Sequence, residues 1–211
     1  MNPRWSSSRE AACRDRSLAE ERAKLASRSR MLRWTWQLPL ALALAALAIA
    51  ALGFTPAAIA AVYLAAVTPE LVRIDLSEHR LPNRMVVPGI AVGLVTAGLS
   101  WVLRGEPPLI PLVAALATAG LLALLALGGG IGMGDVKLAA LIGLASPTIA
   151  IAPVAPLAAF LLGGVAASIV LVRGVVAGRG REARRTHLAF GPFLLAGYFV
   201  ALAPACVGWA S

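Results

Sequence analysis

The chain carries, between two long apolar runs, the stretch Gly128-Gly129-Gly130-Ile131-Gly132-Met133-Gly134-Asp135-Val136-Lys137-Leu138. It contains one of only two aspartates in the apolar part of the sequence. The other is Asp75, in Ile74-Asp75-Leu76-Ser77-Glu78-His79-Arg80-Leu81-Pro82-Asn83. Because glycine lets a second backbone or a substrate come close, the glycine run can bring the acidic group of Asp135 to a cavity where a helix begins.

The composition indicates a membrane protein. Of the 211 residues, 59% are hydrophobic and only 14% are charged, whereas about a quarter of the residues of a soluble domain are charged. The net charge of +9 is distributed as expected for orientation in a membrane, so no nucleic-acid partner is predicted. Cys13 and Cys206 lie at opposite ends of the chain and do not supply the ligand set of a zinc site. We therefore expect a lipid bilayer around the chain and neither a metal nor a cofactor.

The apolar segments predict an all-α fold, a polytopic bundle of about seven membrane-spanning helices. A helix needs about 20 apolar residues to cross the hydrocarbon of a bilayer. Pro69 and Glu70 interrupt the second segment near its end, and Pro82 and Pro88 are expected to stop and restart helices around Asp75. The expected spans are residues 36–54, 57–72, 86–103, 109–127, a short or broken segment from 136, 157–172 and 188–209.

The first 34 residues form a separate region. They hold nine lysines and arginines among four acidic residues and several serines, and they have no apolar core to bury. We expect a cytosolic tail over residues 1–34, disordered or with a short helix, followed by a membrane-embedded domain over residues 35–211. Alternatively, translation starts at Met31, and most of this tail is not part of the protein.

Lysine and arginine outside the tail predict the orientation in the membrane, because cytoplasmic loops carry an excess of these residues. With a cytoplasmic N-terminus, the outer loops hold Arg104 alone. The inner loops then hold Arg73, Arg80, Arg84, Lys137, Arg173, Arg179, Arg181, Arg184 and Arg185. This orientation puts Asp75 and Asp135 on the same, cytoplasmic side, at the ends of the second and fourth spans.

Each aspartate has a structural explanation as well as a functional one. Asp135 could cap the next helix, and Gly130 and Gly134 could form a small-residue packing face. Asp75 could be a solvated aspartate of a polar loop. A carboxylate beside a membrane span is nevertheless a candidate functional residue, since burying an unpaired charge there costs at least about 2.5–3.5 kcal/mol.

Together the two aspartates suggest acid–base chemistry. Like charges a few Å apart cannot both ionise cheaply, so such a pair holds one neutral and one ionised carboxyl group. The ionised member can take a proton from water while the neutral member donates to a carbonyl oxygen, which hydrolyses a peptide bond without a metal. His79 and His187 are too few and too far apart in sequence to indicate a metal site.

Three motifs make the chain resemble the type IV prepilin peptidases, the GxGD class of membrane aspartyl proteases. The stretch Gly132 to Leu138 resembles the GxGD-x-K-L signature of that family, and Asp75 followed by Leu81-Pro82-Asn83 resembles its first-aspartate motif. The stretch Leu188-Ala189-Phe190-Gly191-Pro192-Phe193-Leu194 is similar to its late Pro-Phe-Gly-Pro-Phe-Leu segment, with Ala189 where a proline is usual. The resemblance covers about residues 57–205.

The resemblance implies an aspartic endopeptidase of the inner membrane. Such an enzyme cuts the basic leader from prepilins or pseudopilins of type IV pilus and protein secretion systems, after a glycine and on the cytoplasmic face. Asp75 and Asp135 would be catalytic, and the supporting motif residues would be Pro82, Asn83, Gly132, Gly134, Lys137, Phe190, Gly191 and Pro192. The chain lacks the tetracysteine loop of the larger members, so the resemblance does not extend to their N-methyltransferase activity. The oligomeric state stays open.

A second interpretation belongs to another class. Broken helices with glycine and proline near acidic groups also occur in transporters. The chain could therefore be a non-enzymatic polytopic membrane protein, transporter-like or an assembly subunit, in which Asp135 is a helix cap or an ion-coupling group. A presenilin-type peptidase, which shares GxGD, fits less well, because Asp75 lies beside Leu-Pro-Asn and not in a Tyr-Asp pair.

Overall fold

The computed structural model describes residues 35–128, 131–146, 148, 151–176 and 189–206. The chain divides into two compact units, Met1–Leu40 and Ala41–Ser211, and the first contributes only residues 35–40 to the described part. The described residues form seven helices and no strand, which confirms the predicted all-α membrane bundle. The predicted tail lies outside the described residues, so the domain boundary after residue 34 stays a prediction.

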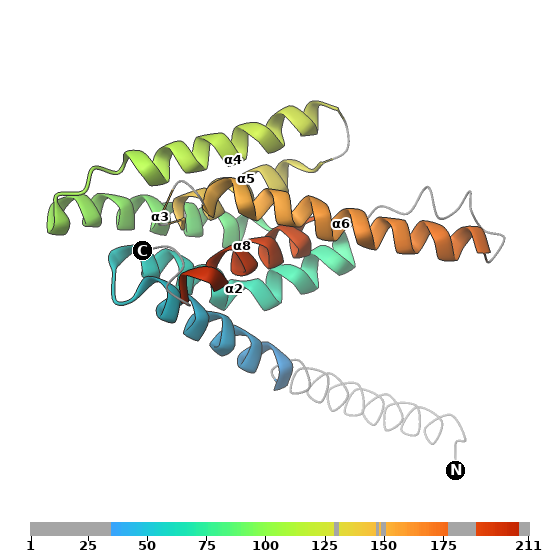
Figure 1. The fold of residues 1–211 in the computed structure, drawn as a ribbon, viewed down its shortest axis with the longest axis horizontal. Helices are drawn as coiled ribbons and strands as arrows, with labels where there is room; N and C mark the ends of the chain where they lie inside the picture. Colours follow the sequence, from blue (N-terminus) through green and yellow to red (C-terminus); the bar gives the residue numbers. More distant parts are fainter. Residues whose placement is uncertain (1–34, 129–130, 147, 149–150, 177–188, 207–211) are drawn as a thin grey trace, which may run out of the picture. The chain divides into compact units, whose positions relative to one another are not determined.

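Five of these helices are long and apolar enough to cross a membrane. They are Thr35–Leu52, α2 (Pro56–Glu78), α3 (Asn83–Arg104), α4 (Leu109–Leu127) and the segment Ile151–Arg173 of α6 (Ile151–Val176) (Figure 1). The other two are shorter, with 12 residues in α5 (Met133–Leu144) and 16 in α8 (Gly191–Cys206). At 1.5 Å per residue, α5 is about 18 Å long and cannot cross the roughly 30 Å hydrocarbon layer alone. The expectation of a short fifth segment is confirmed.

The second helix is longer than the sequence predicted, and this changes the environment of Asp75. α2 continues through Pro69 and ends at Glu78, with His79 in the left-handed conformation (φ 52°) as its C-cap. A proline removes one helical hydrogen bond, and the surrounding helices tolerate that loss here, since Pro69 is buried in the bundle. Asp75 therefore belongs to a helix and is buried, and its expected place in a solvated loop was wrong.

Other prolines also lie within helices rather than between them. α3 begins at Asn83, directly after Pro82, and continues through Pro88. α6 begins at Ile151 and contains Pro156, so it starts earlier than the expected residue 157. Pro88 and Pro156 are each the sixth residue of their helix, beyond the first turn, so each removes one helical hydrogen bond and the helix nevertheless continues. By contrast, the predicted bounds 109–127 match α4 at both ends.

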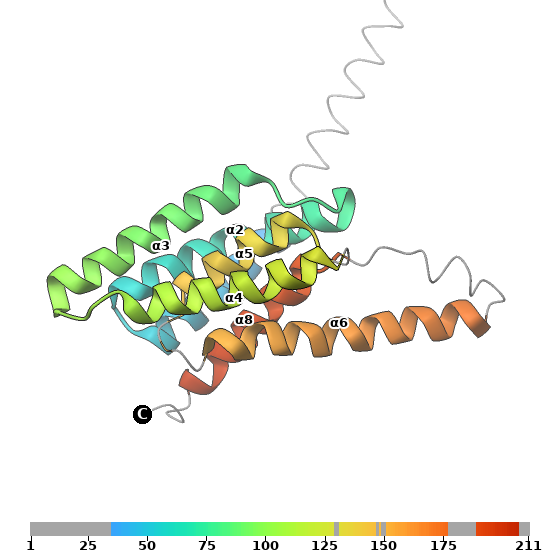
Figure 2. The same ribbon diagram turned by 90° about the horizontal axis from the view of Figure 1, so that it is seen from above.

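The short helix α5 lies at the centre of the second unit. It contacts α2, α3, α4, α6 and α8, and Figure 2 shows α3 on one side of it and α6 on the other. Its side chains are buried nearly all round, which fits a helix covered by protein rather than lipid. The larger buried apolar residues of the core come from α2, α3, α4, α5, α6 and α8: Leu64, Leu71, Val86, Leu122, Leu138, Leu141, Ile142, Ile151, Leu194, Leu195, Tyr198, Phe199 and Leu202.

Candidate active site

Specific contacts fix α5, which carries Asp135, against its neighbours. The hydroxyl of Thr118 on α4 donates to the carbonyl oxygen of Ala139 at 2.9 Å, and the hydroxyl of Tyr198 on α8 donates to that of Ala145 at 2.9 Å. Both bonds are buried. The Thr118 hydroxyl also lies within hydrogen-bond distance of two carbonyl oxygens of its own helix (2.8 Å and 3.2 Å), so its bond to α5 is shared. Since a buried donor without a partner costs about 1–3 kcal/mol, the Tyr198 bond favours the observed position of α5. The N-terminus of α5 is thereby held in a defined position.

Asp135 lies in the first turn of α5 and is only 9% exposed. The N-cap of this helix is Gly132, which has no side chain, and Asp135 is the third helical residue, whose carboxyl group interacts with the backbone N–H of Gly132. Within the described part of the chain, its Oδ1 atom is buried and has no hydrogen-bond partner. A buried oxygen without a donor is costly, which makes Asp135 a candidate for contact with another molecule.

The protonation of Asp135 is shifted toward the neutral form. α5 is not one of the five membrane-spanning helices. Burial, and after it the negative charge of Asp75, raises the pKa of Asp135 to about 6, against a smaller lowering by the backbone N–H of Gly132. The electrostatic effect of Asp75 shows that the two carboxyl groups interact. This is the direction expected for a carboxyl group that lies near a second carboxylate.

Asp75 lies on the last turn of α2 and is 5% exposed. Its Oδ2 atom accepts a hydrogen bond of 3.0 Å from the backbone N–H of Gly191, the first residue of α8. The first N–H groups of a helix have no intrahelical acceptor, so this carboxyl group supplies one. Residues 116 positions apart in the sequence are joined in this way, and the first and third motifs meet.

Leu81, in the first motif, lies close to one glycine of each of the other two motifs. A Cβ atom at position 134 would lie 2.9 Å from the Cβ of Leu81, and one at position 191 would lie 3.5 Å from its Cδ2. Gly134 thus allows α5 to approach the connection between α2 and α3. The sequence interpretation named Pro82 and Asn83 and left Leu81 out of the candidate residues. Its place directly before Pro82 in the first-aspartate motif was the available signal.

Lys137 and Asn83 join the second motif to the first. Lys137 Nζ donates to Asn83 Oδ1 at 3.0 Å, at an exposed position. Asn83 is the first residue of α3, and Pro82 is its N-cap. The bond links the beginning of α5 with the beginning of α3, so two residues predicted only as motif support are brought together.

The other third-motif candidates, Phe190 and Pro192, flank Gly191 at the start of α8. The ring of Phe190 packs against that of Phe160 on α6 with centroids 5.0 Å apart. Pro192 is half-buried in the first turn of α8. Of the motif residues, it is therefore Gly191 that contacts Asp75 through its backbone.

In the glycine run, the described glycines do not have backbone angles that require glycine. The run matters because one glycine allows a neighbouring residue to approach the backbone closely. Gly132 has φ −78° and ψ 149°, and Gly128 has φ −75°, both open to any residue. A Cβ atom at position 132 would lie 3.5 Å from Asp135 Oδ2, an ordinary contact distance. Gly134 is the glycine whose missing side chain the packing requires. Gly129 and Gly130 lie outside the described residues.

Other sequence candidates add little to this centre. Among the residues that the structure describes, no group of three or more histidine, cysteine, aspartate or glutamate side chains could hold a metal ion. His79 is exposed at the end of α2 and acts electrostatically on Asp75. His187 and the basic segment 179–185 lie outside the described ranges.

Comparison with known proteins gives the family. Residues 62–170, just over half of the chain, match the model of the type IV leader peptidase family. The matched region contains Asp75, Asp135, Leu81 and the Lys137–Asn83 bond, whereas Gly191 lies beyond it. Searches of the curated proteins and of the solved structures found no match. The chain is a multi-pass, helical membrane protein that belongs to the type IV leader peptidase family.

Proposed function

We propose that this peptidase is an aspartic endopeptidase with Asp75 and Asp135 as its catalytic pair. The observation that carries the proposal is the meeting of two buried carboxyl groups from separate motifs, one of which has a buried oxygen without a partner. Membership of a peptidase family favours this function over a transporter or assembly subunit. The contact of Asp135 with the backbone N–H of the N-cap Gly132 does not account for its Oδ1 atom, which is buried without a partner among the described residues.

The pair would hydrolyse a peptide bond by acid–base catalysis. The ionised carboxylate takes a proton from a water molecule, whose oxygen attacks the carbonyl carbon. The neutral carboxyl group gives its proton to the carbonyl oxygen. When the tetrahedral intermediate collapses, the C–N bond breaks and the departing nitrogen takes a proton, so that one water molecule is consumed. Burial strengthens these electrostatic interactions because little water screens them.

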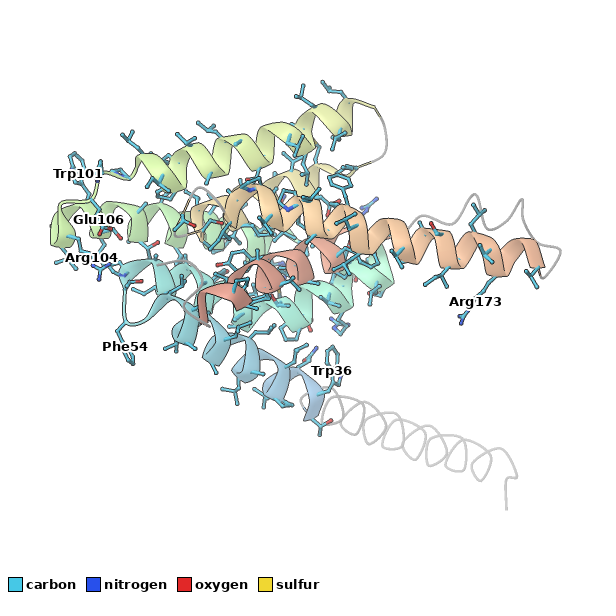
Figure 3. All side chains as sticks on the ribbon, viewed as in Figure 1. Trp36, Phe54, Trp101, Arg104, Glu106 and Arg173 are labelled. Carbon is cyan, nitrogen blue, oxygen red and sulfur yellow. The ribbon has the colours of Figure 1, made fainter. Side chains whose placement is uncertain are left out.

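The proposed substrates are prepilins or pseudopilins, cut after the glycine that ends a basic leader. The active site would face the cytoplasm and the chain would lie in the inner membrane. Figure 3 supports this orientation, because Arg104 lies at one end of the second unit, beside Glu106, and Arg173 lies at the other end. α3 runs from the acid-bearing end to Arg104, so the single basic residue of the predicted outer loops lies away from Asp75 and Asp135. By the positive-inside rule the acids would then lie at the cytoplasmic face of the membrane.

The test is co-expression with a precursor that has a basic leader, a glycine and an apolar helix, followed by mass spectrometry of the product. The wild type should release the leader after the glycine. Asp75→Asn and Asp135→Asn should each lower processing by at least about a hundredfold, since each removes one of the two proton-transfer groups. Glu78→Gln is the matched control, because Glu78 is an exposed acid on the same turn of α2. Full processing by either Asn variant contradicts the proposed pair.

A further inference from the structure

We propose that Gly191, in the third motif, is a positioning residue that makes Asp75 the ionised base of the pair and leaves Asp135 as the acid. The proposal rests on the proposed peptidase function and assigns each carboxyl group its role. It concerns a residue outside the family match, which ends at residue 170. Its basis is the single backbone contact between the N-terminus of α8 and Asp75 Oδ2.

The contact supplies what an ionised carboxylate needs. Gly191 N–H donates to Oδ2 at 3.0 Å, and the bond is buried. A hydrogen bond to a charged acceptor is roughly twice as strong as one between neutral groups. The N-terminus of a helix also carries a partial positive charge that favours an anion. Both effects act on the carboxylate form of Asp75, and neither requires a charged side chain: the described part of α8 contains none.

Asp135 also lies at a helix N-terminus and interacts with one backbone N–H, that of Gly132. It differs from Asp75 in its Oδ1 atom, which is buried without a donor among the described residues, so an ionised Asp135 would leave negative charge on an oxygen that no donor compensates. When the two carboxyl groups share one proton, that proton is more stable on Asp135. Besides Asp135, the side chain of His79, after the end of α2, acts electrostatically on Asp75. His79 is unchanged in every variant below.

The assignment gives a balanced first step. The carboxylate of Asp75 takes one proton from water through its Oδ1 atom, while Oδ2 stays bound to Gly191 N–H. The water oxygen forms a bond to the scissile carbonyl carbon. The proton of Asp135 moves to the carbonyl oxygen, so the pair ends the step with Asp75 neutral and Asp135 ionised.

Only glycine fits at position 191 in this arrangement. A Cβ atom there would lie 2.6 Å from Asp75 Oδ2 and 3.3 Å from its Cγ. Carbon and oxygen atoms that are not bonded do not approach so closely, so either the carboxyl group or the start of α8 would have to move. Any such movement lengthens or breaks the hydrogen bond. The absence of a side chain is therefore what allows the N–H group to reach the acid.

The experiment measures kcat/KM against pH for wild type and Gly191→Ala, with the precursor of the processing assay reconstituted in liposomes. Loss of the N–H bond destabilises ionised Asp75, so the acidic limb of the profile should move up by about one pH unit or more. Gly197→Ala is the structural control, because Gly197 on α8 packs against Ala155 and Ala159 and not against an acid. Gly98→Ala is the neutral control, since a Cβ atom at Gly98 meets nothing within 4 Å.

A lower rate in Gly191→Ala with an unmoved acidic limb would overturn the proposal, because that is the result of a purely structural role. If Gly191→Ala does not fold, glycolic acid at position 191 replaces the N–H by an ester oxygen and adds no atom. The ester variant should show the same shift of the limb. An unshifted limb in the ester variant would overturn the assignment.

Thermal unfolding tests the contact without a substrate. The ester should lower the Tm at pH 8 more in the wild-type background than in Asp75→Ala, which has no acceptor. A smaller loss common to both backgrounds is expected, because the Phe190 carbonyl that accepts from Phe193 and Leu194 becomes a weaker ester acceptor. Equal losses in both backgrounds refute the contact. If the wild type cleaves no precursor, the proposed peptidase function fails, while this comparison still decides whether Gly191 holds Asp75.

Discussion

The close approach between Gly134 and Leu81 makes one substitution especially informative, Gly134→Ala. The added Cβ atom would lie 2.9 Å from the Cβ of Leu81 and 3.5 Å from both its Cδ1 and its backbone nitrogen. Carbon atoms in contact are ordinarily about 3.5–4.0 Å apart. The N-terminus of α5 and the α2–α3 connection must therefore separate by roughly 0.6–1 Å. Because Leu81 is met at its Cβ, a change of its rotamer cannot relieve the contact.

The expected effect falls on catalysis more than on folding. Overpacking of this kind costs about 1–3 kcal/mol of stability, which the buried contacts of α5 with α4 and α8 can withstand. A displacement of about 1 Å at a catalytic group can lower the rate by about a hundredfold. We expect Gly134→Ala to remain folded and to lose about tenfold to a hundredfold in kcat, and Gly134→Val to lose more.

The assay is single-turnover cleavage of the precursor by purified protein, with circular dichroism and gel filtration as tests of folding. Gly98→Ala, on the open face of α3, is the matched control and should cleave at the wild-type rate. Leu81→Gly removes the obstructing Cβ, so the double variant Gly134→Ala/Leu81→Gly should recover activity relative to Gly134→Ala alone. Wild-type cleavage by Gly134→Ala would refute the close-approach explanation of this glycine.

Two further predictions concern the charged groups of the site. Asp135→Asn should raise the free energy of unfolding at pH 8 by up to about 3 kcal/mol. The pKa of Asp135 is about 6 in the folded protein and 3.8 ordinarily, so the ionised acid destabilises the fold, with the full effect above pH 6. This gain should shrink as the pH falls from 6 to 4, where the wild-type acid is protonated, and an equal gain at pH 4 and pH 8 contradicts the assignment. Lys137→Met and Asn83→Ala should each lower kcat by about three- to tenfold, the equivalent of about 0.6–1.4 kcal/mol, through loss of their mutual hydrogen bond. The double variant should be no worse than either single one, and fully additive losses would show that the two side chains act separately.

The sequence was sufficient for those features that depend on composition and local pattern. Long apolar segments predicted a helical membrane bundle, and the bounds of α4 matched at both ends because no proline or charge interrupts that segment. Repeated prolines shortened the expected fifth segment, and α5 is indeed only 12 residues long. The motif order around Asp75 and Asp135 indicated the family, which the match over residues 62–170 establishes.

Helix ends near prolines were less predictable. Pro69 suggested that α2 ends before Asp75, yet the helix continues to Glu78. A proline costs a helix one hydrogen bond, and whether the helix tolerates that loss depends on the helices packed around it. The burial of Asp75 could not be read from a polar local sequence for the same reason, since the residues that cover it come from elsewhere in the chain.

What the sequence determined by itself was the set of chemical groups: two acids, a glycine-rich approach to one of them, and three motifs in order. Only the tertiary structure decided how these groups differ. It gave Asp75 a donor in Gly191, left Asp135 Oδ1 without one among the described residues, and placed Leu81 against Gly134. The physical reason is that the state of a buried carboxyl group depends on donors and charges within a few Å, and here the donor is 116 residues away along the chain.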